Sequence, residues 1–195
     1  MARSAAQTRQ RILDAAYALF WRQGFLRVSM DEIAGRTNVT KRTLYQHFRS
    51  KDDLITATLA HSSELAIATL ERIRLPMNRE AMIDSLFGQI EDWAAKPRWS
   101  GGGFTRVVVE LADLRGHPAR AIARRHKVAV EVWIAGRLAS AGVSSPRERA
   151  CEVVLLMEGA MVLMLIHGDR SYARAAARAA KQLVRKKRLA DKPAR

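Results

Sequence analysis

Hydrophobic residues recur along most of this chain at intervals of three and four, which places them on one face of an α-helix. The first such run is Ile12, Leu13, Ala16, Leu19 and Phe20. Gly24 follows it and is suited to end the helix as a C-cap. Residues 1–8 lack the period and are expected to form a mobile arm. Sustained alternation of apolar and polar residues is absent, so the pattern predicts an all-α fold of about nine helices.

Prolines and glycines divide the rest of the chain into further helical segments. A Val triplet within residues 106–111 favours a strand by propensity alone, but its surroundings favour a helix. After residue 50 we expect about six helices, over residues 51–74, 79–95, 104–114, 118–141, 146–166 and 172–187.

Two short helices with a tight turn between them are predicted within residues 29–51. Ser29 and Glu32 have the spacing of a capping box, which starts a helix at Met30. Thr40 occupies the cap position of the next helix, and Asn38 precedes it where the turn needs a left-handed residue. This arrangement is typical of a helix-turn-helix.

The second short helix has a polar outward face. Leu44 and Phe48 lie side by side on a helical wheel and fix the buried direction, so Gln46 points almost opposite. No carboxylate lies on that face within the helix itself. A face of this composition suits the major groove, where such side chains meet phosphate oxygens and base edges.

The run T-K-R-T-L-Y-Q-H-F-R-S-K-D-D-L resembles the DNA-binding domain of the TetR family of transcriptional regulators. The family pattern T-L-Y-x-x-F-x-x-K-x-x-L is matched here by Thr43, Leu44, Tyr45, Phe48, Lys51 and Leu54. Asn38 departs from the glycine usual in that turn, but asparagine also tolerates left-handed geometry.

This resemblance implies a helix-turn-helix DNA-binding domain over residues 1–52 and a ligand-binding and dimerisation domain over residues 53–195. It also implies that residues 51–74 form the rod between the two. Phosphate contacts are expected from Ser29, Thr43, Tyr45 and Lys51, and base contacts from Lys41, Arg42 and Gln46. His47 either faces bases or packs at the domain edge. The DNA-binding residues expected are therefore Ser29, Thr40, Lys41, Arg42, Thr43, Tyr45, Gln46, His47 and Lys51.

The net charge of +15 is concentrated at the two ends of the chain. Residues 1–51 hold ten Lys or Arg against three acids, residues 52–169 hold fourteen against fifteen, and residues 170–195 hold ten against one. A basic N-terminal segment that coincides with a helix-turn-helix favours a polyanionic partner. For the basic run at residues 185–188 we predict no specific role.

A cytoplasmic location is expected. The single cysteine, Cys151, excludes an intrachain disulfide, and the N-terminal residues lack the apolar segment of a signal peptide. The most apolar run, residues 153–166, contains Glu158 and is shorter than the about 20 residues that a membrane span needs. We therefore interpret this run as a buried helix and expect no membrane association.

A homodimer through the last two helices is predicted. Residues 151–166 are apolar on nearly every face, more than one domain of this size encloses easily, so a subunit interface is the natural cover. The last helix has a side of small residues, which would let the same helix of a second chain approach closely. That side consists of Ala173, Ala176, Ala177, Ala180, Leu183 and Val184. Two helices from each subunit would make a four-helix bundle, as the resemblance also implies.

Candidate ligand contacts in the second domain are large or charged side chains that could line and orient a pocket, although aromatic residues at helical spacing are more often ordinary core. They are Trp93, Trp99, Phe104, Arg106, Glu110, Trp133 and Met157, with Arg98, His126 and Glu158 as further orienting groups. No metal-ligand spacing such as C-x-x-C or H-x-x-x-H is present, so neither a metal site nor a cofactor is expected.

These observations predict a ligand-responsive regulator that binds a palindromic operator as a homodimer. The resemblance implies that it represses transcription, as members of the family usually do. A two-fold dimer requires half-sites about 34 Å apart or multiples of that distance. One alternative is a sequence-independent DNA-coating protein, suggested by the high charge. Another is an enzyme with an accessory helix-turn-helix, but G-x-S-x-G and paired catalytic groups at sensible spacing are absent, so we expect no enzyme.

Overall fold

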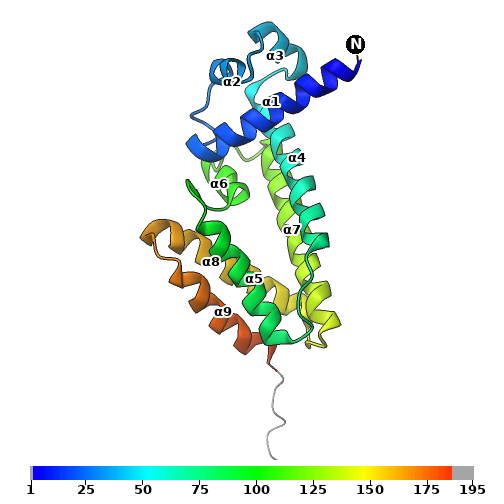
Figure 1. Cartoon of the computed structure of the whole chain (residues 1–195), viewed down its shortest axis with the longest axis vertical. Coiled ribbons are helices and arrows are strands. Elements are labelled where there is room, and N and C mark those ends of the chain that lie inside the picture. Colours follow the sequence, from blue (N-terminus) through cyan, green and yellow to red (C-terminus); the bar gives the residue numbers. More distant parts are fainter. Residues whose placement is uncertain (1, 186–195) are drawn as a thin grey trace, which may run out of the picture. The chain divides into compact units, whose positions relative to one another are not determined.

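The structure of the chain, a computed structural model, describes residues 2–185 and, over that range, consists of helices without strands (Figure 1). The predicted all-α fold is confirmed, including three N-terminal helices followed by six more. The helices are α1 (Ala2–Gln23), α2 (Met30–Thr37), α3 (Lys41–His47), α4 (Lys51–Arg72), α5 (Arg79–Ala94), α6 (Gly103–Glu110), α7 (Pro118–Ser140), α8 (Pro146–His167) and α9 (Ser171–Val184).

The predicted arm at the N-terminus is wrong for residues 2–8, because α1 already begins at Ala2. Alanine and glutamine in this segment are good helix formers and need no apolar face to continue a helix that is anchored further along. The Thr8 hydroxyl donates to the Ser4 carbonyl at 2.9 Å, as a side chain within a helical turn does.

Two other boundaries differ from the predictions. Helix α6 ends at Glu110, and residues 111–113 form a turn. Helix α9 ends at Val184, and the last two residues of the predicted helix, 186 and 187, lie outside the described residues. The Val triplet at residues 107–109 is helical. Val107 is fully buried and Val109 is exposed, so these two residues lie on different sides of α6.

The chain divides into two compact units. The first comprises residues up to 72 together with 100–129, and the second comprises residues 73–99 together with 130–185. The functional boundary that the resemblance implies, between residues 52 and 53, stays a prediction about which residues bind DNA.

The first unit has a continuous apolar core in which α1 packs against α2 and α4. Its largest fully buried side chains are Ile12, Phe20, Phe25, Ile33, Leu44, Phe48, Leu54, Ile55 and Leu59. Helix α6 joins this core so closely that its first residue has no room for a side chain. A Cβ added to Gly103 would lie 2.1 Å from the Trp21 ring, a distance that no pair of carbon atoms tolerates.

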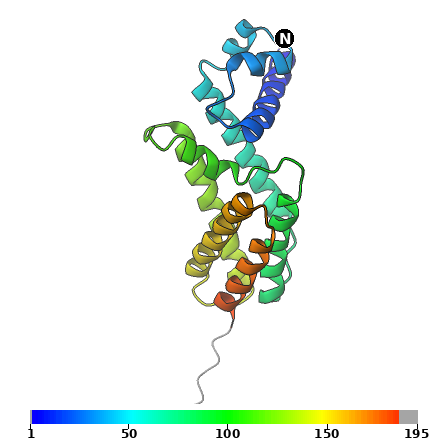
Figure 2. The same ribbon diagram turned by 90° about the vertical axis from the view of Figure 1, so that its left-hand side faces the viewer.

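The second unit is organised around α9, which packs against both α8 and α5 (Figure 2). The alanine side of α9 is buried in this packing, with Ala173, Ala180 and Val184 fully buried. The prediction that this side meets a second chain is therefore wrong. Small residues do allow close approach here, but the neighbours are α5 and α8 of the same chain. Ala175 and Ala179, on the next face of α9, are the exposed alanines.

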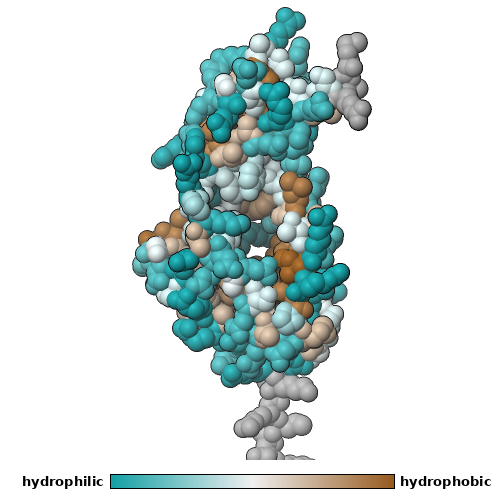
Figure 3. Space-filling view, in the orientation of Figure 1, coloured by the Kyte–Doolittle hydropathy of each residue, from teal (hydrophilic) through white to brown (hydrophobic). Residues whose placement is uncertain are grey.

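Helix α8 is not buried by its own chain. Ala150, Val153 and Met164 face the core, whereas Leu155 is 67% exposed and Ile166 is 66% exposed. Brown atoms gather at the left edge of Figure 3, over the end of α8. Contrary to the prediction, this 22-residue helix has the length and apolar composition to cross a membrane, with 28% of its most apolar stretch buried. Core helices of soluble proteins also pass that test.

Candidate nucleic-acid interface

Helix α2 begins and ends with the local bonds that its sequence predicts. The Glu32 amide donates to the Ser29 hydroxyl at 3.1 Å, and the Ser29 amide donates to the Glu32 carboxylate at 3.3 Å, so the capping box is complete. At the other end Asn38 adopts φ 53° and ψ 41°, the left-handed geometry predicted for the turn. These two caps fix the position at which the chain reverses toward α3.

Helix α3 is short and is fixed to the core by two apolar residues. The Thr43 amide donates to the Thr40 hydroxyl at 3.1 Å, which confirms Thr40 as the N-cap. Leu44 is fully buried and Phe48 is 1% exposed, as the helical wheel predicts. This anchoring fixes the orientation of α3, so its polar side chains lie on a defined face.

Arg42, Tyr45 and Gln46 form the most accessible part of that face. All three are exposed, with Tyr45 at 47%. The side chains of Arg42 and Gln46 make no hydrogen bond or ion pair with another of the described residues. Their donors and acceptors are therefore available to a partner. Thr43 and His47 are half-buried at the edges of the face.

Lys41 is already paired, a feature that inspection of the helix alone missed. Its ammonium lies 2.7 Å from the Asp31 carboxylate of α2, and both side chains are 63% exposed. The hydrogen bond to Asp31 raises the pKa of Lys41, so this side chain stays charged. Exposed ion pairs are weak, and a phosphate or base can displace the carboxylate without a large penalty.

Lys51 supports the loop between α1 and α2. Its Nζ donates to the Leu26 carbonyl at 2.6 Å, and burial lowers the pKa of this ammonium while Asp52 and Glu110 oppose the shift. Its predicted contact with a phosphate remains untested. Even without DNA, this side chain fixes the segment that leads into α2.

Arg106 and Glu110, predicted as ligand contacts, hold the same loop. The Leu26 amide donates to Glu110 Oε2 at 3.0 Å, and Arg106 Nε lies 2.7 Å from Glu110 Oε1. Arg106 Nη1 also donates to the Trp21 carbonyl at 3.1 Å. This cluster binds α6 to the end of α1. Arg106 and Glu110 therefore have structural partners within the chain, and their role toward a ligand stays a prediction.

Phe104 lies close to the same cluster. Its ring stacks on His126 with centroids 3.7 Å apart, and it meets Trp21 edge-on at 6.2 Å. The Ser63 hydroxyl is 3.0 Å from His126 Nδ1, which connects α4 with α7. Phe104 is thus part of the packing of the first unit.

The other ligand candidates, Trp93, Trp99, Trp133 and Met157, pack against the core of the second unit. Trp93 and Trp99 meet edge-to-face with centroids 5.9 Å apart. The indole nitrogens of Trp99 and Trp133 are buried and have no acceptor among the described residues. Buried donors without acceptors are costly, so each nitrogen can accommodate an acceptor from outside the described residues. In the part of the chain that the structure describes, groups of metal-ligating side chains are absent.

Two arginines of α1 were missed by sequence inspection. Arg11 Nη2 donates to the Thr37 carbonyl at 2.5 Å, which holds the end of α2, and Arg9 lies over the Phe48 ring at 5.0 Å. Only their positions just before the apolar residues of α1 could have indicated these contacts, because Thr37 and Phe48 lie far along the sequence.

Comparison with known proteins agrees with this geometry. The family described as "Bacterial regulatory proteins, tetR family" matches residues 12–58, which span α1 to the first part of α4. The transcriptional regulator UidR of Escherichia coli is 28% identical over 169 residues, which cover 86% of this chain and 82% of UidR.

Two solved structures share the fold over nearly the whole chain. A TetR-family transcriptional regulator from Streptomyces coelicolor is 23% identical with a TM-score of 0.77, covering 92% of this chain and 95% of its own. The multidrug binding protein EbrR, solved with ethidium, is 22% identical with a TM-score of 0.71 and covers 92% and 99%. The helix-turn-helix and the family model that matches residues 12–58 identify a TetR-family DNA-binding domain, and both solved structures show that the chain shares their fold.

Proposed function

We propose that this protein is a ligand-responsive repressor that binds a palindromic operator as a cytoplasmic homodimer. The observation that carries the DNA-binding part is the exposed polar face of the core-anchored helix α3, where Arg42 and Gln46 have no partner among the described residues. In this proposal residues 1–52 bind DNA and residues 53–195 bind the effector and the second subunit.

Arg42 and Gln46 are the residues that read bases. A guanidinium recognises guanine through two parallel hydrogen bonds, and an amide recognises adenine in the same way. Both side chains are exposed and have no partner among the described residues, so reaching a base breaks no existing bond. Ser29, Thr40, Thr43, Tyr45 and Lys51 hold phosphates, whereas Lys41 exchanges Asp31 for the DNA.

The dimer forms through an apolar stripe on α8, made of Leu155, Gly159, Val162 and Ile166. These four exposed residues follow one another at helical spacings and share one face. A Cβ at Gly159 would have no atom within 4 Å, so a partner helix has room to approach there. A second copy of α8 is the occupant that symmetry favours, because a two-fold interface pairs a surface with itself. The exposed Ala175 and Ala179 of α9 complete a four-helix bundle.

The effector binds in the second domain, and the two buried indole donors of Trp99 and Trp133 support this. A ligand with hydrogen-bond acceptors on an apolar body would satisfy both donors. EbrR, with the same fold, was solved with ethidium. A ligand of this kind releases the operator only if it binds the two arrangements of the DNA-binding domains with different affinities.

Selection of bound sequences from a random duplex pool tests the proposal. We expect enrichment of an inverted repeat, with the chosen duplex preferred over random duplex at matched salt concentration. Equal binding to all duplexes would instead support a sequence-independent DNA-coating protein, whose affinity comes from phosphate contacts alone.

A further inference from the structure

A ladder of ion pairs joins α5 to α9 on the surface of the second unit. Arg174 pairs with Glu91, Lys181 Nζ lies 2.8 Å from Asp84, and Arg185 Nε lies 3.0 Å from Glu80. The helices run antiparallel, so each step forward along α5 corresponds to an equal step backward along α9. From Asp84 to Glu91 and from Lys181 to Arg174 the step is seven residues on both helices.

One position in this ladder lacks its carboxylate. Arg178 lies between Arg174 and Lys181 on α9, four residues from the first and three from the second, so it shares their face. On α5 the corresponding positions are Phe87, which is buried in the core, and Gly88, which has no side chain. Arg178 is exposed and makes no ion pair with another described residue. The ladder therefore contains one guanidinium without an acid.

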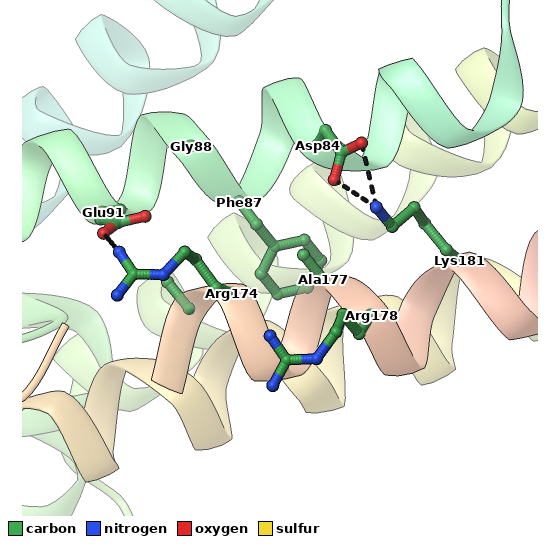
Figure 4. A pocket seen from close by; sticks show the side chains of 9 residues that line it. Asp84, Phe87, Gly88, Glu91, Arg174, Ala177, Arg178 and Lys181 are labelled. Atoms are coloured by element: carbon green, nitrogen blue, oxygen red, sulfur yellow. Dashed lines mark hydrogen bonds and ion pairs between the residues drawn. The ribbon is translucent and has the colours of Figure 1, made fainter. Parts of the chain in front are cut away.

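Because Gly88 has no side chain, a groove lies between α5 and α9 at this point (Figure 4). Its volume is about 270 Å³, and it is lined by Phe87, Gly88, Ala177 and Arg178 between the flanking pairs Glu91–Arg174 and Asp84–Lys181. An added Cβ at Gly88 would meet no atom within 4 Å. The groove is thus open above the glycine and is bounded by small or apolar groups.

The charges around the groove favour one negative charge. Glu91 and Asp84 are neutralised by Arg174 and Lys181, which leaves the charge of Arg178 uncompensated. A guanidinium binds a planar carboxylate through two parallel hydrogen bonds. A doubly charged phosphate is less suited, because the charged residues that line the groove leave only one positive charge uncompensated.

We propose that this groove binds a small organic carboxylate, with the carboxylate on Arg178 and an apolar part over Gly88 and Ala177. The volume lies just below the usual range of about 300–1,000 Å³ for ligand pockets, which favours a compact metabolite. The site is separate from the α8 stripe, because its lining residues belong to α5 and α9. The proposal does not depend on DNA binding.

Benzoate is a suitable probe, and benzamide is its uncharged counterpart. Isothermal titration or the arginine Nε–Hε NMR signals of the full-length protein, in a buffer free of phosphate and carboxylates, should show saturable binding of benzoate. Benzamide should bind about tenfold or more weakly, because it lacks the charge-assisted bond. Inorganic phosphate should also bind more weakly than benzoate.

Two substitutions locate the site. Arg178→Gln removes the guanidinium, and Gly88→Glu supplies the missing carboxylate from within the chain; each should weaken benzoate binding by about tenfold or more. The matched control is Arg147→Gln, which removes one exposed charge from the first turn of α8 and should change the affinity less than about twofold.

Equal binding of benzoate and benzamide would overturn the proposal. An equal loss of affinity in Arg147→Gln and Arg178→Gln would also overturn it, by assigning the effect to net charge. Tighter binding of phosphate than of benzoate would overturn the choice of a carboxylate.

Discussion

The DNA-binding helices and the α8–α9 pair differ in how completely a single chain buries their apolar side chains. In the helix-turn-helix, each apolar side chain that the pattern places inward is buried, and both short helices have a side-chain cap at the start. On α8, by contrast, Leu155, Val162 and Ile166 remain exposed after the chain has folded. The first region buries its apolar side chains within one chain, whereas the second leaves apolar side chains at the surface, as interaction sites do.

This difference indicates that α3 and α8 are suited to different kinds of binding. A polar face without internal partners, such as that of Arg42 and Gln46, is suited to a polar ligand that comes and goes. An apolar stripe on a long helix is suited to a permanent interface, because exposing it to water is costly at every moment. We therefore expect changes in α8 to affect assembly and changes in α3 to affect recognition.

The largest effect is expected from Val162→Asp, which places a charge in the centre of the α8 stripe. Burying an unpaired carboxylate between two subunits is strongly unfavourable, so the dimer should dissociate. Affinity for the operator should fall by about 100-fold or more, because a monomer forms only half of the contacts. Size-exclusion chromatography with light scattering and gel-shift assays measure the two effects.

Val132→Asp is the matched control for this substitution, because Val132 is 66% exposed on α7 and lies outside the stripe. It should leave the molar mass and the operator affinity unchanged. A dimer that survives Val162→Asp would show that another surface joins the subunits.

Arg42→Ala should weaken operator binding by about 1–3 kcal/mol and relax the preference at one base pair. The physical reason is the loss of a two-bond contact with a base edge. Binding to a panel of single-base operator variants measures both quantities. A uniform loss across the panel would assign Arg42 to a phosphate, and Arg147→Ala should have little effect on any of them.

Gly103→Ala should destabilise the first unit by about 1–3 kcal/mol, because the new methyl group would overlap the Trp21 ring. For a chain of this size that corresponds to a fall in Tm of about 2–4 °C per kcal/mol. Gly116→Ala is the control, since a Cβ there has no atom within 4 Å. Equal Tm values for the two variants would contradict the close packing of α6 on α1.

The N-caps Ser29 of α2 and Asn78 of α5 allow one substitution in each unit to be compared. Ser29→Ala and Asn78→Ala each remove a side-chain bond to a helix amide, at 3.1 Å and 3.0 Å respectively. Both should lower the free energy of unfolding by about 1 kcal/mol, because capping is a local effect in either unit. Only Ser29→Ala should also weaken DNA binding. Denaturant titration and gel shifts separate the two outcomes.

The smallest effect is expected at Asp169, beside the start of α9. Hydrogen bonds from the Ser171 hydroxyl and amide, at 2.6 Å and 2.8 Å, lower the pKa of this carboxyl. Because the folded pKa lies below the unfolded one, the stabilisation is present above the unfolded pKa and is lost as pH falls through the folded pKa. Asp169→Asn should therefore lower Tm slightly at about pH 7 and leave it unchanged at about pH 2. A Tm difference that persists in acid would contradict this assignment.

Residues close together in the sequence account for most of what could be predicted. Ser29 with Glu32, Thr40 with Thr43, and the left-handed Asn38 each act over three residues or fewer, and all were predicted from the sequence. The inward positions of Leu44 and Phe48 follow from helical period in the same way. Hence the fold class and the two capped helices of the helix-turn-helix were predictable from the sequence alone.

Contacts between distant segments had no such signal. Only the folded chain shows that Lys41 pairs with Asp31 and that the Leu26 amide donates to Glu110, 84 positions away. The same holds for the absence of a carboxylate opposite Arg178.

The sequence by itself determined which residues are apolar and where each helix begins, because capping and periodicity depend on neighbours within one or two turns. It did not determine which neighbour each apolar face would meet. Alanines were expected to face a second subunit, but the tertiary structure places Ala173 and Ala180 against α5 and α8, while Val162 and Ile166 remain at the surface. Helical period gives the direction of a face on its own helix, and only the packing of all the helices decides what lies opposite it.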